Sequence, residues 1–497
     1  MSVQLRQLDT SASDFEAGFA KLRHWSEEAD HAIEGRVAEI LADVKARGDA
    51  AVLDYTRRFD WPEATADGLE VSEDTLASAE GDIEAAEGFV CGDLSFLREA
   101  AERIHQFHCA ERERLQSWTQ EQENGVTLGQ VLHPVKRAGV YVPGGKAAYP
   151  STVLMAALPA VVAGVDEIII CTPAGKDGQI NPLIAMVASP YATKVFKIGG
   201  AQAIAAMAYG TATVPKCDVI VGPGNAYVNT AKKLVYGEVG LDMLAGPSEV
   251  AVIADEGANP AFVAADLLAQ TEHGHDNRGV LFSHSSDVLE KCKIELSQQR
   301  AELSRKEILA VTANNLIFVK TNSLEESLAL SNVFAPEHLE LMVREPLAAL
   351  PLVRNAGAVL LGDHTSAPIG DYWAGPSHTL PTAGAARYAS PLSVATFMKR
   401  TSVLYYSPQA ALEAAEDVAR FAEAEGFDGH AQAARLRGEP TPRQVAAPPE
   451  TGGGGVSEGV DEEEGAASGA PPPPVLTSSS SRFGKTPVSA ANKEVGF

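Results

Sequence analysis

The chain has 497 residues and a formal net charge of −26 at pH 7, and 45% of its residues are hydrophobic. Its length exceeds one ordinary domain of roughly 100–200 residues and provides material for more than one core. The acidity and the lack of a basic patch exclude a typical nucleic-acid binder. No apolar run reaches the ~18–20 residues that cross a bilayer. We therefore expect no nucleic-acid partner and no membrane segment.

Cysteine usage and the amino-terminal sequence bear on the compartment. The cysteines are odd in number, scattered and without a C-x-x-C motif, which makes a disulfide framework a poor interpretation; they are Cys91, Cys109, Cys171, Cys217 and Cys292. The first residues lack the basic and apolar segments of a secretory signal. We expect a reducing compartment, the cytoplasm, or a plastid if a transit peptide had been removed.

Residues 1–136 are predicted to be mostly helical. Apolar residues recur at helical spacing from Ala32 to Asp60 and again from Leu97 to Trp118. We treat this stretch as an N-terminal helical segment, part of which packs with a later domain of residues 246–390.

The pattern changes at Ala138, where β-branched runs begin to alternate with helices and glycine turns. Strands are predicted at Glu167 to Cys171 and Lys194 to Ile198, and a second alternating stretch begins at Glu249. Such alternation predicts parallel, doubly wound sheets. We therefore predict an α/β fold with two incomplete Rossmann-like domains, residues 137–245 and 246–390.

Three strand-to-helix turns of the first domain are rich in glycine, and they begin at Pro143, Gly199 and Gly222. Backbone amides at helix N-termini favour phosphate, and glycine lets a ligand approach closely. No G-x-G-x-x-G motif follows a strand. The alternative is that these turns need only backbone freedom, so the residues alone leave nucleotide binding open.

The chain becomes helical again after Pro391, and residues 391–443 are predicted to form a C-terminal helical arm. Residues 444–497 are mostly Gly, Pro, Ser and acidic residues, which predicts a disordered tail. Gly484-Lys485-Thr486 resembles the end of a phosphate loop. However, Ser479 stands where the loop requires glycine, and no strand precedes it, so we reject that interpretation.

The dipeptide Glu337-His338 is the sharpest chemical signal. It follows Pro336 and precedes an apolar, strand-like run. A carboxylate and an imidazole at the start of one element could act as paired bases. The alternative is a helix-capping Glu followed by a surface His.

Gln270 and His273 lie three residues apart at the end of a predicted helix, so they share a face. They could hold two corners of a metal site, although glutamine is an unusual zinc ligand. Spacing alone does not identify the other ligands.

Several collinear motifs between about residue 5 and about residue 437 resemble the histidinol dehydrogenase family. They are V-K-R-A-G-V-Y-V-P-G-G, G-G-A-Q-A-I-A-A-M-A-Y-G-T, G-P-G-N-A-Y-V, D-M-L-A-G-P-S-E-V, Q-T-E-H-G, A-P-E-H-L-E, I-G-D-Y, G-P-S-H-T-L-P-T and A-E-G-F-D-G-H. Each motif is short, but their shared order is specific.

The resemblance implies a sequential oxidation of L-histidinol to L-histidinal and then to L-histidine, with two NAD per turnover. This reaction is the last step of histidine biosynthesis. The family is an intertwined homodimer with one zinc per subunit, in which the partner's C-terminal arm completes each active site.

The family's site residues carry over by position. Its two proton acceptors fall on Glu337 and His338. Its zinc ligands fall on Gln270, His273, Asp371 and His430. Its substrate contacts fall on Ser248, Gln270, His273, His338, Asp371, Glu425 and His430, with His378 nearby. Its cofactor contacts fall on Tyr141, Gln202 and Asn225. Glu425 and His430 would come from the partner subunit.

Some features depart from the family pattern. His275 stands where proline is common, E-G-F-V-C-G-D-L looks like a small insertion, and the acidic tail lies outside the family core. One rival function is a sister enzyme that oxidises another polar alcohol, such as a sulfonated diol. Another is a non-catalytic, metal-bound structural or regulatory protein. The intact A-P-E-H-L-E and E-G-F-D-G-H motifs favour histidinol.

Overall fold

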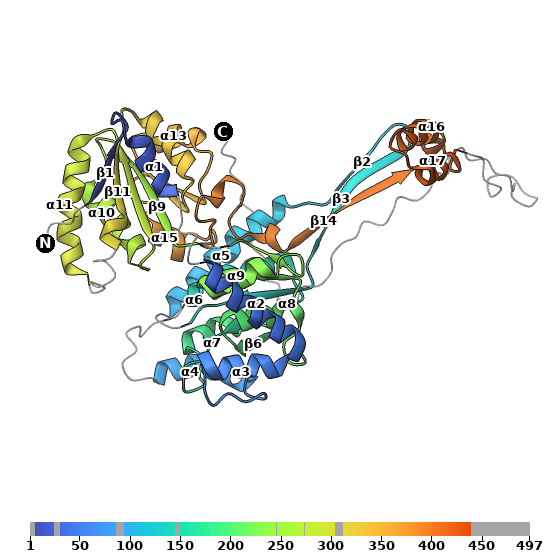
Figure 1. Ribbon diagram of the computed structural model, residues 1–497, viewed down its shortest axis with the longest axis horizontal. Helices are drawn as coiled ribbons and strands as arrows, with labels where there is room; N and C mark the ends of the chain where they lie inside the picture. Colours follow the sequence, from blue (N-terminus) through green and yellow to red (C-terminus); the bar gives the residue numbers. More distant parts are fainter. Residues whose placement is uncertain are drawn as a thin grey trace, which may run out of the picture. The chain divides into compact units, whose positions relative to one another are not determined.

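A computed structural model describes residues 5–23, 30–85, 94–144, 149–244, 246–272, 274–303 and 312–438. These residues fall into two compact units that divide between Ala414 and Ala415 (Figure 1). His273, the tail of residues 444–497 and its Gly484-Lys485-Thr486 sequence lie outside the described residues.

A five-stranded parallel sheet organises the first half of the larger unit. Its strands follow the order β6-β5-β4-β7-β8. Their bounds are Arg137–Tyr141 (β4), Glu167–Thr172 (β5), Lys194–Lys197 (β6), Val219–Val221 (β7) and Gly240–Leu241 (β8). In chain order this is 3-2-1-4-5, the arrangement of a doubly wound nucleotide-binding half.

Helices cover both faces of this sheet because its strands are apolar on both sides. In β4, Ala138 and Val140 face one core, whereas Tyr141 faces the other. The first core includes α4 (Glu73–Ala85), α5 (Ser95–Arg114), α6 (Pro150–Ala163) and α7 (Pro182–Ala188). The second includes α2 (Asp30–Arg47), α3 (Asp49–Phe59), α8 (Gly200–Tyr209) and α9 (Ala226–Leu234).

A second parallel sheet follows the order β1-β11-β10-β9-β12-β13. Its strands are Arg6–Asp9 (β1), Glu249–Ala254 (β9), Arg278–Ser283 (β10), Leu316–Lys320 (β11), His338–Met342 (β12) and Ala358–Leu361 (β13). Apart from β1, the order is again 3-2-1-4-5. The N-terminal strand therefore joins this sheet from far away in sequence.

Helices also sandwich the second sheet (Figure 1). One face carries α10 (Pro260–Thr271) and α11 (Ser286–Glu302). The other carries α1 (Phe15–Arg23) and α13 (Leu324–Phe334). Shorter helices follow at α14 (Pro346–Ala349) and α15 (Ala367–Tyr372).

An antiparallel ribbon was not foreseen in the sequence. It pairs β3 (Val126–Pro134) with β2 (Trp118–Glu121) and β14 (Met398–Tyr406). β2 is exposed throughout and β14 almost so. Without a buried face, these strands lack the alternation that identifies a strand in sequence.

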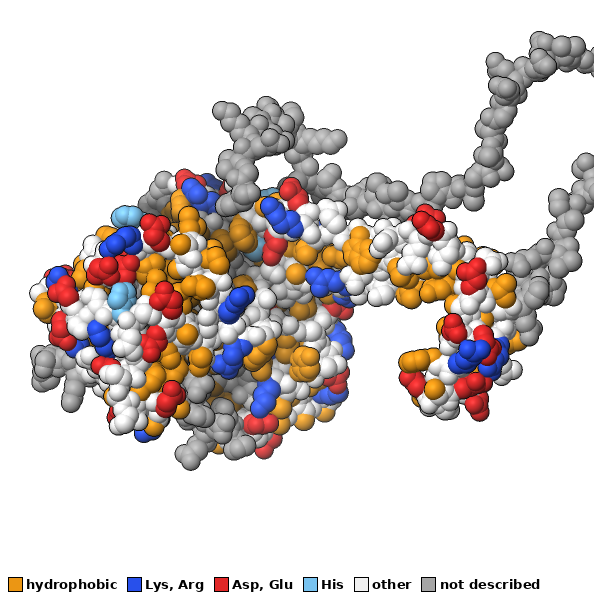
Figure 2. Space-filling view, turned by 90° about the horizontal axis from the view of Figure 1, so that it is seen from above, with side chains coloured by type: hydrophobic (Ala, Val, Ile, Leu, Met, Phe, Trp, Pro, Cys, Tyr) orange, Lys and Arg blue, Asp and Glu red, His pale blue; other side chains and the backbone are white. Residues whose placement is uncertain are grey.

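The smaller unit contains the end of α16 (Pro408–Ala424) and α17 (Asp428–Arg435). Its small core is formed by Ala419, Ala422 and Ala431. Large apolar side chains remain exposed on β14 and on this unit, including Leu404 at 69% and Phe421 at 70% exposure. Figure 2 shows such orange side chains among charged ones on one face of the molecule.

The predicted α/β class, with parallel sheets between helices, is confirmed. No helix among the described residues could span a bilayer. The exact domain boundaries, the nucleotide-binding nature of either sheet and the homodimer stay predictions.

A buried ion pair stabilises the turn after β7. Lys232 and Asp242 are fully buried and in contact. Lys232 Nζ also donates to the carbonyl oxygen of Gly222 at 3.0 Å, and Asp242 Oδ2 accepts the Gly222 amide at 2.8 Å. Both backbone groups of Gly222 are thus held by one pair of charges.

Replacing Lys232 with methionine should therefore destabilise the protein strongly. Asp242 would become an uncompensated buried charge, a change that typically costs about 3–5 kcal/mol. Urea unfolding of Lys232→Met against the parent chain measures this. Lys45→Met breaks the exposed pair with Glu238 and should cost under ~1 kcal/mol. Equal losses in the two variants would contradict the importance of the buried pair.

Candidate active site

Glu337 and His338 lie at the amino end of β12, inside the larger unit. Helix α13 ends at Phe334, and Ala335 adopts a left-handed conformation with φ of 55°. Pro336 cannot continue the helix, so the chain turns into the strand. Glu337 is 6% exposed and His338 is 4% exposed. Their burial rules out the alternative of a surface histidine.

A chain of polar contacts links this pair to two predicted metal ligands. Glu337 Oε2 accepts the Glu249 backbone amide at 2.9 Å and Gln270 Nε2 at 3.3 Å. His338 Nε2 lies 3.1 Å from Asp371 Oδ1. His338 Nδ1 lies 3.9 Å from Glu337 Oε2. The structure thus brings together three separate parts of the sequence: Gln270, the pair Glu337-His338, and Asp371.

Burial shifts the protonation of both bases. It raises the pKa of Glu337 to about 7, although the charge of His338 opposes this. Burial alone would lower the pKa of His338. The hydrogen bond to Asp371 and the charge of Glu337 outweigh that effect, so the pKa of His338 is raised. A carboxylate that titrates near neutral pH is suited to exchange protons during a reaction.

Asp371 lies on the short helix α15. The helix begins where the Ala367 amide donates to Glu340 Oε1 at 3.1 Å. His378 Nδ1 lies 3.0 Å from the carbonyl oxygen of Asp371. These contacts anchor the helix on both sides of Asp371 and place His378 beside it.

Ser248 joins the cluster through Asn277. The Ser248 amide donates to Asn277 Oδ1 at 3.2 Å, and Asn277 Nδ2 donates to the carbonyl oxygen of Gln270 at 3.1 Å. The Ser248 side chain also hydrogen-bonds Glu337 and helps to restrain the pKa of that carboxyl. The sequence interpretation missed Glu249, which lies inside a quoted motif, and Asn277, which lies three residues after the end of another.

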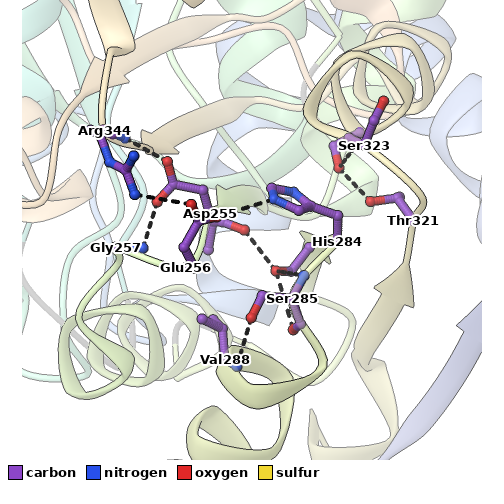
Figure 3. A network of polar contacts seen from close by, with 12 residues as sticks. Asp255, Glu256, Gly257, His284, Ser285, Val288, Thr321, Ser323 and Arg344 are labelled. Carbon is purple, nitrogen blue, oxygen red and sulfur yellow. Dashed lines mark hydrogen bonds and ion pairs between the residues drawn. The ribbon is translucent and has the colours of Figure 1, made fainter.

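The site occupies the amino edge of the second sheet, whereas open α/β sheets usually bind ligands at the carboxyl edge. At the carboxyl edge of this sheet, polar side chains form a network of contacts with one another (Figure 3). Asp255 accepts the amides of Gly257 and Arg344 at 2.8 and 2.7 Å. Glu256 pairs with His284 at 3.2 Å and with Arg344 at 2.9 Å. These groups satisfy one another.

Three predicted site residues fall outside the part of the larger unit that the structure describes. His273 lies outside the described residues. Glu425 and His430 belong to the smaller unit, where both are exposed and His430 contacts the Phe427 ring. In the described ranges, no group of three His, Cys, Asp or Glu side chains could hold a metal ion.

The donor types nevertheless fit a metal. Gln270 is buried and donates through Nε2 to Glu337, which turns its Oε1 into the atom that a metal could contact. Asp371 adds a carboxylate, and His273 and His430 are imidazoles, which are common zinc ligands. Two of the four predicted zinc ligands, Gln270 and Asp371, thus belong to one chain of contacts within the larger unit.

The predicted cofactor residues lie at the carboxyl edge of the first sheet. Tyr141 ends β4, and its hydroxyl accepts the Gly200 amide at 3.1 Å. Gln202 is buried in α8, and Asn225 caps α9 by accepting the Val228 amide at 3.1 Å. β4 and β7 are the neighbours at which the strand order reverses, where dinucleotides bind in such sheets.

The glycine turns fit both alternatives left open by the sequence. Gly222 has a φ of 109°, and a Cβ there would lie 2.2 Å from the carbonyl oxygen of Tyr141. Backbone constraint therefore explains this glycine. It does not explain the polar side chains of Tyr141 and Gln202 at the same edge, which are typical of a ligand site.

A buried second carboxyl beside Glu337 predicts a pH dependence of stability. Burial, and then the charge of Glu337, raise the pKa of Glu249 from 4.5 to about 8. In the unfolded chain the Glu249 carboxyl ionises with its ordinary pKa of 4.5, so the free energy of unfolding is fully preserved below about pH 4.5. It decreases as the pH rises from there to about 8, the pKa of Glu249 in the folded protein. Glu249→Gln should therefore raise the melting temperature, relative to the parent, more at pH 9 than at pH 5. An equal difference at both pH values would contradict this.

Comparison with known proteins identifies the family. Residues 23–438 match the family model described as histidinol dehydrogenase. The histidinol dehydrogenase of Geobacter sulfurreducens is 44% identical over 436 residues, which cover 87% of this chain and all of that protein. That of a Synechococcus species is 48% identical over 407 residues, covering 81% and 92%. A crystal structure of histidinol dehydrogenase from Elizabethkingia anophelis superposes with a TM-score of 0.80 at 33% identity, covering 87% of this chain and 98% of that one. The chain belongs to the histidinol dehydrogenase family.

Proposed function

We propose that this protein is a zinc-dependent histidinol dehydrogenase. It oxidises L-histidinol to L-histidinal and then to L-histidine with two NAD, the last step of histidine biosynthesis. The observation that carries the proposal is the buried contact chain from Gln270 through Glu337 and His338 to Asp371. Membership of the family supports the choice of substrate.

His338 is the base of the first oxidation. Its Nε2 faces Asp371, which favours the tautomer with the proton on that nitrogen. Nδ1 is then the basic atom, and it is buried 3.9 Å from Glu337 Oε2. It would take the proton of the substrate hydroxyl during the first oxidation, and NAD, when bound, would supply the hydride acceptor.

Glu337 is the base of the second oxidation. It takes a proton from the water that adds to the aldehyde, and the resulting hydrate loses the second hydride. Its pKa of about 7 suits this task, since a weaker acid makes a stronger base while remaining partly ionised at neutral pH. The Glu249 amide and Gln270 fix one carboxylate oxygen, which orients the other.

Zinc and NAD occupy separate edges in this proposal. Gln270, His273, Asp371 and His430 would hold zinc, which when bound anchors the imidazole and amine of the substrate. Tyr141, Gln202 and Asn225 would contact NAD at the carboxyl edge of the first, Rossmann-like sheet. Ser248 and Glu425 would contact the substrate.

A homodimer completes the site in this proposal, with Glu425 and His430 supplied by the partner subunit. Two features support it. The apolar side chains of Leu404, Phe421 and Phe427 are exposed, as interface residues would be in an isolated subunit. Glu425 and His430 are themselves exposed within the smaller unit.

The two rival functions are less well supported. A non-catalytic metal protein has no need for two buried bases with raised pKa values. A sister enzyme for another polar alcohol would share the bases but not the preference for an imidazole-bearing substrate.

The decisive experiment is NADH formation at 340 nm with L-histidinol. We expect turnover that is lost on chelation and restored by zinc. A sulfonated diol should give no reaction under the same conditions. Bound zinc without turnover of histidinol would refute the proposed substrate.

Glu337→Gln should separate the two oxidations. The amide cannot accept a proton from water, so the step from histidinal to histidine should fall by at least ~100-fold, the usual contribution of a general base. Oxidation of histidinol to histidinal should fall far less. Single-turnover assays with each substrate measure the two steps. Equal losses would argue against the water-activating role.

A further inference from the structure

Dinucleotide-binding sheets of the order 3-2-1-4-5 commonly carry an acidic residue near the end of the second strand, where it receives the ribose hydroxyls. The second strand here is β5, which ends at Thr172 and continues into Pro173 and Ala174. The next acid is Asp177, which is exposed and accepts the Gln179 amide at 3.1 Å within its own turn. The expected acid is therefore missing from this strand end.

Asp60 reaches the same place from a different part of the chain. It follows α3, and its amide donates to the carbonyl oxygen of Thr56 at 2.9 Å, which fixes the end of that helix. A Cβ added to Gly199 would lie 2.9 Å from Asp60 Oδ2 and 2.7 Å from Pro173 Cβ. The carboxylate thus lies between the ends of β5 and β6.

The neighbours of Asp60 are the predicted cofactor residues. Gln202 Nε2 lies 3.4 Å from Asp60 Oδ2. The Gly199 amide donates to the carboxylate. Burial raises the pKa of the Tyr141 hydroxyl, and the nearby charge of Asp60 adds to this increase. All of these groups belong to the edge at which the strand order predicts a dinucleotide.

The carboxylate has no ion-pair partner in the described part of the chain. Burial raises the pKa of Asp60 to about 6, and the Gly199 amide limits the increase. The group is therefore largely ionised at neutral pH. A half-buried anion without a cation favours hydroxyl donors and repels a second anion placed beside it.

We infer that Asp60 determines the choice of dinucleotide: its carboxylate accepts the ribose hydroxyls of NAD and excludes a ribose that carries a phosphate, as in NADP. The inference rests on the proposed function, because it requires a dinucleotide at this edge. Asp60 contacts the cofactor and takes no part in proton transfer.

The test is the binding of NAD and of NADP to the full-length, zinc-loaded protein by calorimetry. The parent chain should bind NAD at least roughly tenfold more tightly than NADP. The phosphate of NADP would lie beside the Asp60 carboxylate, and the repulsion between two such anions is sufficient for a difference of this size. Asp60→Asn should weaken NAD roughly tenfold, the usual cost of losing a charged hydrogen-bond partner. The same substitution should not weaken the binding of NADP, so the preference for NAD over NADP should be lost.

Asp177→Asn is the matched control, because it removes one negative charge from the loop that follows the same strand. It should leave both affinities unchanged. If it shifts the preference while Asp60→Asn does not, the role belongs to Asp177 and the inference is wrong. Asp60→Ser replaces Asp60→Asn if the latter fails to fold, as judged by circular dichroism.

Different results would overturn the role of Asp60 and the proposed function. A parent chain that oxidises histidinol with NAD but shows an unchanged preference after Asp60→Asn would overturn only the role of Asp60. A parent chain that binds neither dinucleotide and oxidises no histidinol would overturn the proposed function as well.

Discussion

The hydrogen bond from the Glu249 amide to the Glu337 carboxylate ties the first residue of β9 to the turn before β12. The two strands are parallel neighbours, with His338 opposite Val250. This register places both bases and Gln270 around one buried point. Because an unpaired carboxylate there would be costly, the amide also stabilises the ionised form that the proposed chemistry needs.

Apart from β1, the two sheets share one strand order, yet their candidate sites lie on opposite edges. In the first sheet the carboxyl edge carries Tyr141, Gln202 and Asp60, which is the usual position for a dinucleotide. In the second sheet that edge carries Asp255, Glu256 and the residues that they contact. The bases lie at the amino edge instead. One architecture thus supports two different tasks in the proposed enzyme.

Local patterns predicted much of this structure, and their limits have physical causes. Apolar runs and glycine turns predicted most strands of both sheets because buried parallel strands need continuous apolar sequence. The N-terminal strand β1 and the two-residue strand β8 were not predicted. The exposed strands β2 and β14 have no such pattern and were missed. Glu337-His338 was singled out because Pro336 ends the preceding segment. Glu249 and Asn277, which lie near this pair in the folded protein, were missed because their contacts are with residues remote in sequence.

The sequence by itself determined the α/β class, the alternation of strands and helices, the family and the pair of candidate bases. These follow from periodicity and from short motifs, which are local properties of the chain. Only the tertiary structure decided that Glu337 and His338 are buried, that Asp371 faces His338, and that Asp60 reaches the edge left without an acid by β5. Burial and long-range contacts set the pKa of a side chain, and neither can be read from its sequence neighbours.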